Sequence, residues 1–246
     1  RASVVDIHSS VYGSFRDQLA SDTSENALRD RLSLPFLKRY ERQYCQKFSD
    51  LVVTTEDDRT QIGALSGHSR IHNIPNGVDL VRFPLRQRDP GGYSLIFVGA
   101  MDILANIDAV TYLTEAIFPA IRQRYPDAQL YLVGTRPTAQ VKALGSQPGV
   151  IVTGRVESMA DYLHQTTVSV IPMRTGYGIK NKTLESMAAG VPVVASDRGL
   201  EGLAVDSPDV PLRALRANRP EEYVNAISRL FDEAALRQRL SENARA

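Results

Sequence analysis

The stretch that decides the fold runs from Thr175 to Gly199 and reads TGYGIKNKTLESMAAGVPVVASDRG. It opens with a glycine-rich loop that carries two lysines, Lys180 and Lys182, and it continues as a predicted short helix with Glu185 one turn in. Gly190 is a typical residue at a helix end. The apolar run that follows, VPVVA, predicts a buried strand. A loop, a helix and a strand in this order are typical of a parallel α/β sheet.

The loop and the helix start also have the composition of a phosphate site. Glycines at 176 and 178 let the backbone approach a ligand closely. The amides at a helix start, together with its positive dipole end, attract phosphate. Lys182 adds a positive charge there, and the carboxylate of Glu185 can accept two hydroxyl hydrogen bonds. The stretch therefore predicts half of a nucleoside-diphosphate site, with solvated surface lysines as the open alternative.

The totals of the chain narrow the function classes. Its 246 residues, 43% of them apolar, can bury one large core or two smaller ones. A net charge of +1 gives the chain no strong positive electrostatic potential that would attract nucleic acid, so no nucleic-acid partner is expected. A single cysteine, Cys45, excludes an internal disulfide framework and favours a reducing, cytoplasmic location. No apolar run approaches the ~20 residues that span a bilayer. Because the chain starts at Arg1 with residues typical of a strand, we expect a fragment or a processed product.

Two groups of strands and helices are predicted on either side of a linker. The first group occupies residues 1–77 and is expected to be part of a domain. Strands are predicted at 2–7, 51–54 and 70–74. Helices are predicted at 56–65 and at 24–48, the latter with an interruption near Pro35. The linker, at residues 78–92, is rich in proline and charge.

The second group, residues 93–246, alternates between strands and helices. Strands are predicted at 94–98, 129–133, 150–152, 168–171 and 191–195, with helices at 108–124, 138–144, 159–164 and 182–189. One or two amphipathic helices follow Pro220, with Tyr223, Ile227, Leu230 and Phe231 facing inward. Apolar runs of this kind between helices predict an α/β domain with a doubly wound parallel sheet. In such a sheet, ligands bind beyond the carboxyl ends of the strands. That rule selects the glycine-containing loops 99–106, 134–137, 154–157 and 173–181.

The helix predicted after Pro35 has two faces. Leu37, Tyr40, Tyr44 and Phe48 fall on one stripe, and the opposite face is basic with Lys38, Arg39, Arg42 and Lys47. Two interpretations stay open for the basic face. It is either a solvated surface or a weak contact with anionic lipid head groups at the inner face of a membrane.

Several motifs occur in a fixed order along the chain: NGVD (76–79), FVGA (97–100), LVG (132–134), VTGRV (152–156), KTLESMAAGVPVVAS (182–196) and GLEG (199–202). In this order and spacing the chain resembles the family-four retaining glycosyltransferases of the GT-B fold, in which two Rossmann-like domains face each other. The longer runs FVGAMDILANIDAV and GIKNKTLESMA resemble a branch tied to exopolysaccharide or surface-glycan assembly.

The resemblance implies an enzyme that moves a sugar from a UDP- or GDP-linked donor to a glycan or lipid-linked acceptor, with retention of configuration. It implies an acceptor side in the N-terminal domain and a donor site in the C-terminal domain, and it calls for neither a metal nor a cofactor. Two alternatives stay open: a nucleotide-sugar epimerase of the same fold, and a non-catalytic nucleotide-sugar binding module.

The resemblance also assigns roles to individual residues. Glu185 matches the glutamate that binds the ribose hydroxyls, and Lys182 matches a position around the diphosphate; these two are the candidate catalytic residues. The candidate donor-binding residues are Gly99, Asn106, Arg155, Val156, Gly178, Lys180, Asn181, Thr183 and Leu184. On the acceptor side, the candidates are Asp6 and His8; His8 follows the first strand and could orient an acceptor hydroxyl or be a surface turn residue.

The sequence departs from the family pattern at two places. Where members often carry an arginine and a lysine on the diphosphate, this chain has Ala100 or Met101 and Asn106. Eight places before Glu185, where members have another glutamate, stands Tyr177. These departures shift the expected phosphate charge onto Lys182, with Lys180, Arg174 and Arg155 as further candidates. No metal site is expected at His68 and His72, because the stretch is turn-rich and offers no third ligand.

Overall fold

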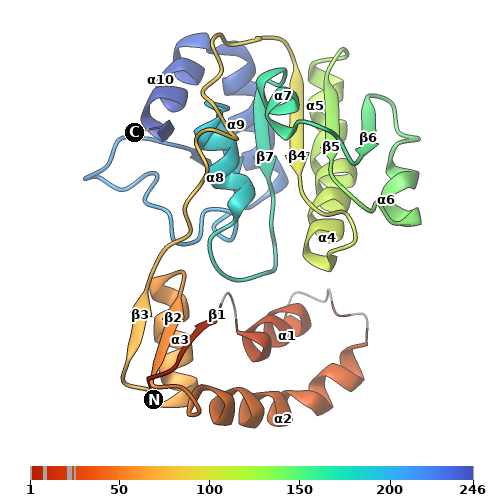
Figure 1. Ribbon diagram of the computed structural model, residues 1–246. Coiled ribbons are helices and arrows are strands. Elements are labelled where there is room, and N and C mark those ends of the chain that lie inside the picture. Colours follow the sequence, from red (N-terminus) through yellow and green to blue (C-terminus); the bar gives the residue numbers. More distant parts are fainter. Residues whose placement is uncertain (1, 8–9, 21–23, 25, 246) are drawn as a thin grey trace. The chain divides into compact units, whose positions relative to one another are not determined.

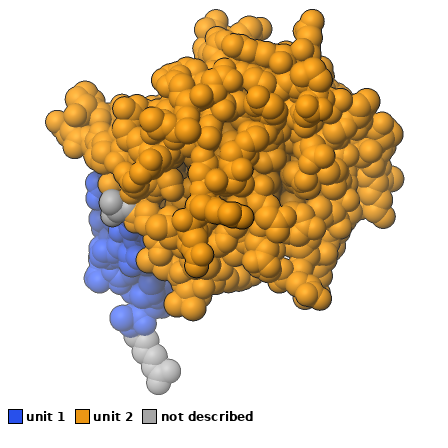
Figure 2. Space-filling view, turned by 90° about the horizontal axis from the view of Figure 1, so that it is seen from above, with its two compact units in different colours: residues 1–76, 175–179, 201–203 blue, residues 77–174, 180–200, 204–246 orange. Residues whose placement is uncertain are grey.

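The computed structural model describes residues 2–7, 10–20, 24 and 26–245, and it divides the chain into two compact units (Figure 2). Unit 1 comprises residues 1–76 with the short segments 175–179 and 201–203. Unit 2 comprises residues 77–174, 180–200 and 204–246. Among the sequence predictions, His8 lies outside the described residues.

Unit 1 is a small parallel α/β layer. Strands β1 (Val4–Ile7), β2 (Asp50–Val53) and β3 (Ile71–Asn73) pair in that order. Helices α1 (Val11–Ala20), α2 (Ala27–Cys45) and α3 (Glu56–Ser66) accompany them (Figure 1). Cys45, Leu51, Val53 and Ile62 form the buried centre.

Two helices of unit 1 differ from expectation. Helix α1 was not predicted, and α2 continues through Pro35 where an interruption was expected, so that prediction was wrong. Proline removes the hydrogen bond to the carbonyl four residues earlier, that of Arg31. Because Pro35 and Arg31 are both exposed, water can replace that bond and the helix continues.

Unit 2 is a larger α/β domain built on a parallel sheet of six strands. The strands are β4 (Ser94–Val98), β5 (Gln129–Val133), β6 (Val150–Gly154), β7 (Val168–Ile171), β8 (Val193–Ala195) and β9 (Leu215–Arg216). Their order across the sheet is β6-β5-β4-β7-β8-β9. The chain therefore builds outward from β4 in one direction and then outward from β7 in the other. This is the order of a Rossmann fold, as the sequence predicted.

The helices of unit 2 follow the predicted alternation with altered bounds. They are α4 (Leu104–Tyr112), α5 (Phe118–Arg124), α6 (Ala139–Leu144), α7 (Met159–His164), α8 (Asn181–Ala188), α9 (Pro220–Asp232) and α10 (Ala234–Arg245) (Figure 1). The single helix expected at 108–124 is divided by a π-helical turn, η1 (Leu113–Ile117). Strand β9 was not predicted. In α9 all four residues expected to face inward are buried.

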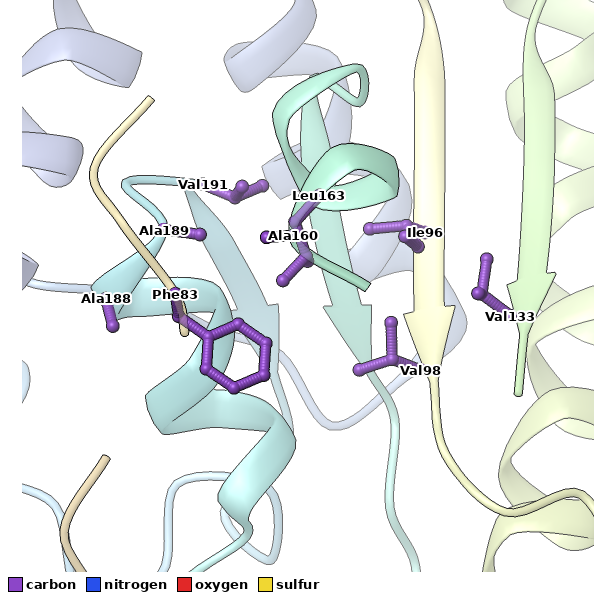
Figure 3. Packing of buried hydrophobic residues seen from close by; sticks show 9 residues of the cluster. All are labelled: Phe83, Ile96, Val98, Val133, Ala160, Leu163, Ala188, Ala189 and Val191. Carbon is purple, nitrogen blue, oxygen red and sulfur yellow. The ribbon is translucent and has the colours of Figure 1, made fainter. Parts of the chain in front are cut away.

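The stretch expected to act as a linker, residues 78–92, is packed onto unit 2. Phe83 is buried in a cluster with residues of β4, α7 and α8 (Figure 3). Arg86 is also buried; its backbone amide donates to the carbonyl of Ala189 and its guanidinium donates to the carbonyl of Thr166. This stretch therefore holds α8 from one side, and α8 carries the candidate site.

Candidate functional site

The candidate site lies where the order of the sheet reverses. Strands β4 and β7 are neighbours, but the chain leaves them in opposite directions along the sheet. In open α/β sheets, ligands bind beyond the carboxyl ends of the strands at such a reversal point. Residues after β4, residues after β7 and the start of α8 come together here.

Two glycines allow the loops after β4 and β5 to approach each other. The amide of Gly99 donates to the carbonyl of Val133 at 3.0 Å. A Cβ placed on Gly134 would lie 1.6 Å from the carbonyl oxygen of Gly99, so no side chain fits there. At Gly99 itself, a Cβ would lie 2.9 Å from Nδ2 of Asn106 and 3.3 Å from Nζ of Lys182. The lack of a side chain at Gly99 is what lets these two groups reach the end of β4.

Lys182 extends from the first turn of α8 toward the end of β4. Its Nζ donates to Oδ1 of Asn106, lies 3.7 Å from Sδ of Met173, and lies 4.4 Å from the centre of the Phe97 ring. Asn106 is buried, and its own Nδ2 donates to the carbonyl of Ala100 at 2.8 Å. The amide of Asn106 is thus oriented by backbone, and its oxygen is presented to the lysine.

The surroundings of Lys182 lower its pKa to about 7. Burial is the main cause, because removing an ammonium from water disfavours its charged form. Lys180 lowers the pKa further by repulsion, while Glu185 opposes the shift by attraction. A buried cation whose charge is poorly compensated is an attractive partner for an anionic ligand.

Glu185 lies one turn further along α8 and is partly buried. Burial raises the pKa of its carboxyl, and the charges of Arg82 and Lys182 act in the opposite direction. Arg82 belongs to the stretch 77–92 that packs on unit 2, and sequence reasoning gave it no role. Lys182 and Glu185 therefore form a cation and a carboxylate on consecutive turns of one helix.

Helix α8 is fixed from both ends by buried hydroxyls. Thr183 Oγ1 donates to the carbonyl of Gly199 at 2.8 Å. The hydroxyl of Ser186 lies 2.8 Å from that of Ser169 on β7. The side chain of Thr183 is thus used in anchoring, and its backbone amide donates to the carbonyl of Lys180 at 2.8 Å.

The other predicted donor-binding residues of unit 2 are arranged as follows. Lys180 is buried at the N-cap of α8, Asn181 is exposed, and Leu184 is partly buried. After β6, Arg155 is exposed and Val156 packs against the buried cluster of Figure 3.

Arg174, one of the further phosphate candidates, is already engaged. Its Nε donates to Asp108 on α4 at 3.0 Å, and its guanidinium lies 4.9 Å from the centre of the Tyr112 ring. This ion pair fixes the loop after β7 to α4. We therefore assign Arg174 to the framework of the site.

Tyr177 and Gly178 belong to unit 1. The hydroxyl of Tyr177 accepts a hydrogen bond from Arg16 at 2.9 Å. Burial is the first cause that raises the pKa of Tyr177 to about 12, followed by Asp17. A buried phenol that stays protonated cannot replace the glutamate that the family pattern has at this position. Here the residue anchors segment 175–179 to α1.

The acceptor-side candidates have less support. Asp6 lies on β1 with an exposed side chain. Unit 1 does contain a cavity of about 240 Å³, which the sequence did not indicate. Its lining comes from α1, α2 and α3 and includes Tyr12, Arg16, Lys38 and Gln61. Because it brings together residues distant in sequence, no local motif could have revealed it.

Neither a metal cluster nor a spanning helix was found in the ranges that the structure describes. No three residues among histidine, cysteine, aspartate and glutamate gather there as metal ligands. The two histidines considered above contact different groups: His68 Nε2 lies 3.0 Å from the carbonyl of Phe48, and His72 Nε2 lies 2.9 Å from Asp50. No helix within the same ranges is long and apolar enough to cross a bilayer.

The family model "Glycosyl transferases group 1" matches residues 92–233, more than half of the chain. The chain belongs to this family. The matched range begins just before β4 and ends just after α9, so it contains the sheet of unit 2 with Asn106, Lys182 and Glu185. The resemblance seen in the sequence is thereby confirmed at the level of the family.

Curated relatives of this chain include the phosphatidyl-myo-inositol mannosyltransferase of Mycobacterium tuberculosis and that of Mycobacterium bovis. Each is 33% identical over 132 residues, which is 50% of this chain and 34% of the relative. The chain thus matches about a third of the length of these relatives.

Solved glycosyltransferase structures share the fold. A sucrose-phosphate synthase from Thermosynechococcus elongatus superposes with a TM-score of 0.73 at 20% identity, over 98% of this chain and 61% of the other. HepE from Anabaena, in complex with UDP and glucose, superposes with a TM-score of 0.69 at 15% identity, over 100% of this chain and 66% of the other. At this identity the similarity supports the GT-B fold.

Proposed function

We propose that the chain carries the donor site of a retaining glycosyltransferase, which moves a sugar from a UDP- or GDP-linked donor to a glycan or lipid-linked acceptor. The observation that carries this proposal is the pairing of Lys182 and Glu185 on consecutive turns of α8, at the point where the sheet order reverses. Membership of the glycosyltransferase family supports the same reading.

The diphosphate is assigned to the start of α8. The positive dipole end of a helix attracts phosphate oxygens. Lys182 supplies a positive charge in place of the lysine that family members often carry at the position of Asn106. The side chain of Asn106 keeps the ammonium of Lys182 directed toward Gly99. The glycine at the end of β4 leaves room for a phosphate or for the transferred sugar.

The ribose is assigned to Glu185. A carboxylate accepts both hydroxyls of a ribose, and a partly buried one gives stronger hydrogen bonds than an exposed one. The same placement leaves the nucleobase toward Arg155 and Val156, beyond β6, where backbone groups can contact it.

The assigned residues can assist the chemistry. In the net reaction the bond between the anomeric carbon and the diphosphate breaks, and its electron pair leaves with the nucleotide. The acceptor hydroxyl forms the new bond on the same face of the sugar and gives up its proton. A protonated Lys182 and the helix dipole stabilise the negative charge that develops on the leaving phosphate.

A turnover assay separates this proposal from its rivals. The protein is incubated with radiolabelled UDP-glucose, UDP-N-acetylglucosamine or GDP-mannose and a lipid-linked acceptor. Transfer with an unchanged anomeric configuration supports the proposal. An isomerised donor would favour an epimerase, and binding without either product would favour a non-catalytic module.

A further inference from the structure

A cavity of about 550 Å³ lies in unit 2, between the stretch 77–92 and helix α10. A volume of this size suits a small-molecule ligand. The backbone amide of Arg86 donates to the carbonyl of Ala189 at the carboxyl end of α8, so the cavity lies at the end of α8 opposite to Lys182. The polar side chains that line it come from the stretch and from α10: Arg86, Arg88, Asp89, Gln238, Ser241 and Glu242.

Arg86 places a buried cation in the wall of this cavity. Only 7% of its surface is exposed, and an arginine stays protonated in proteins, so loss of a proton cannot relieve the cost of burial. A guanidinium can donate several hydrogen bonds. Within the ranges that the structure describes, the guanidinium of Arg86 donates to the carbonyl of Thr166 at 3.1 Å and lies 3.4 Å from Asp89. These two contacts leave donor groups of Arg86 for a ligand.

The carboxylate of Asp89 is shared between two buried arginines. Its nearer partner is Arg237 on α10, whose Nε lies 2.6 Å from Oδ2 of Asp89 and which is also 7% exposed. Arg237 donates in addition to the carbonyls of Leu230 and Phe231 at the end of α9. Burial lowers the pKa of Arg86, the charge of Asp89 opposes this shift, and the charge of Arg237 adds to it. Arg86 is therefore the cation whose charge is less well compensated.

The other polar groups of the lining also favour an anion. Arg88 is exposed and adds a second cation. Glu242 is a carboxylate of the lining, but it is exposed to screening by water and salt, and it accepts a hydrogen bond from Gln238 at 2.9 Å. A phosphate monoester carries close to two negative charges at neutral pH, which matches two arginines. Arginine forks also bind phosphate through paired hydrogen bonds.

We propose that this cavity binds a small phosphate monoester, with its phosphate on Arg86 and Arg88 and the rest of the molecule against Gln238 and Ser241 of α10. The site is separate from the nucleotide-sugar site at the start of α8, and it does not depend on the proposed transferase reaction. The alternative is a purely structural Arg86, which holds the carbonyl of Thr166 and binds no ligand.

Calorimetric titrations with inorganic phosphate and with glycerol phosphate test this site. Phosphate could also occupy the diphosphate position at Lys182, so the titrations use Lys182→Met as the starting protein, with sodium chloride at equal ionic strength as the reference. We expect both ligands to bind Lys182→Met saturably, and the binding to weaken as salt is added.

Further substitutions in Lys182→Met assign the binding to the cavity. Arg86→Gln should weaken it by about tenfold or more, as expected for a lost hydrogen bond between charged groups. Arg88→Gln should weaken it about two- to fivefold, because an exposed cation contributes less. Glu242→Gln should strengthen it, because a negative charge is removed. Lys142→Gln is the matched control, since Lys142 is an exposed cation on α6 that does not line the cavity, and it should change nothing.

Thermal unfolding checks that each variant folds. Arg86 is buried, so the exposed Arg88→Gln carries the test alone if Arg86→Gln does not fold. Absence of saturable phosphate binding by Lys182→Met would overturn the proposal. So would binding by Arg88→Gln, or by a folded Arg86→Gln, that equals binding by Lys142→Gln. Phosphate binding that the parent shows and Lys182→Met loses would belong to the donor site and would also overturn it. A separate titration of the parent with nucleotide sugar keeps the test of the donor site distinct.

Discussion

At the scale of the residue, the site depends on the ammonium of Lys182. The pKa of this group is lowered to about 7, mainly by burial, while Phe97 and Asn106 hold it at the end of β4. A bound diphosphate would favour the charged form and raise that pKa again. Donor binding should therefore take up a proton.

The first prediction concerns pH. Below pH 7 the lysine is already charged in the empty site, whereas above pH 7 a proton must be acquired on binding. The affinity for a nucleotide sugar should thus fall by about tenfold per pH unit above 7. Calorimetry between about pH 6 and about pH 9 measures this slope. The diphosphate diester of a nucleotide sugar does not titrate near neutrality, so the slope reports a group of the protein and not the ligand. A flat profile would remove Lys182 from the diphosphate.

The second prediction concerns Lys182→Met. In the folded protein the pKa of Lys182 is about 7, below the ordinary value of 10.5. Between these two pH values the unfolded chain binds more protons than the folded protein, so the free energy of unfolding rises with pH. At neutral pH the charged lysine therefore destabilises the folded protein. The variant should have an equal or higher melting temperature and should lose the stabilisation that a nucleotide sugar confers. The exposed Lys142→Met is the matched control, with both properties unchanged. Retained ligand stabilisation in Lys182→Met would contradict the assignment.

The residues of the site were only partly predictable from the sequence. Lys182 and Glu185 stand one turn apart in a recognisable motif, so the sequence was sufficient to propose them. The partners of Tyr177 and Arg174 were not predictable, because Arg16 and Asp108 are distant in the chain and form no local pattern. Phe97 looked like an ordinary strand residue, and only the structure reveals the ammonium above its ring.

At the scale of the element, the loops after β4 and β5 approach each other closely at the end of the sheet. Gly134 packs against the carbonyl of Gly99 so closely that a methyl group would overlap it. Backbone must therefore move if any side chain is introduced there, and the end of β4 would move with it.

The third prediction follows from this contact. Gly134→Ala should lower the free energy of unfolding by about 1–3 kcal/mol or more, an amount typical of overpacking, and so lower the melting temperature. It should also weaken donor binding. Gly77→Ala is the control, because a Cβ there would meet nothing within 4 Å. Thermal unfolding and a nucleotide-sugar titration measure the two effects. Equal melting temperatures for the two variants would show that the loop relaxes freely.

Elements of unit 2 were predicted well because their signals are local. Its strands are apolar runs separated by helical patterns, and a parallel sheet covered on both faces explains such runs. Helix α1 was missed because Val11–Ala20 has mixed polarity, and β9 because two residues make too short a signal. Helix α2 passes through Pro35 because solvent can take over the lost hydrogen bond, a tertiary circumstance that sequence rules do not contain.

At the scale of the whole molecule, the chain consists of two compact units, and the family match falls within unit 2. The residues proposed for donor binding that lie in unit 2 come from four separate segments, which the sheet topology gathers. Unit 1 contributes the exposed cationic face of α2. For unit 2 we propose nucleotide-sugar binding.

The most direct test of the central claim is a calorimetric titration of UDP-glucose, UDP-N-acetylglucosamine and GDP-mannose into the parent protein and into Glu185→Ala. We predict that at least one donor binds the parent. We predict that the variant binds it about 1–3 kcal/mol more weakly, because ribose hydroxyls lose their acceptor. The exposed Glu115→Ala should bind as the parent does. No binding at millimolar donor, or equal affinity for the parent and a folded Glu185→Ala, would contradict the donor site described above.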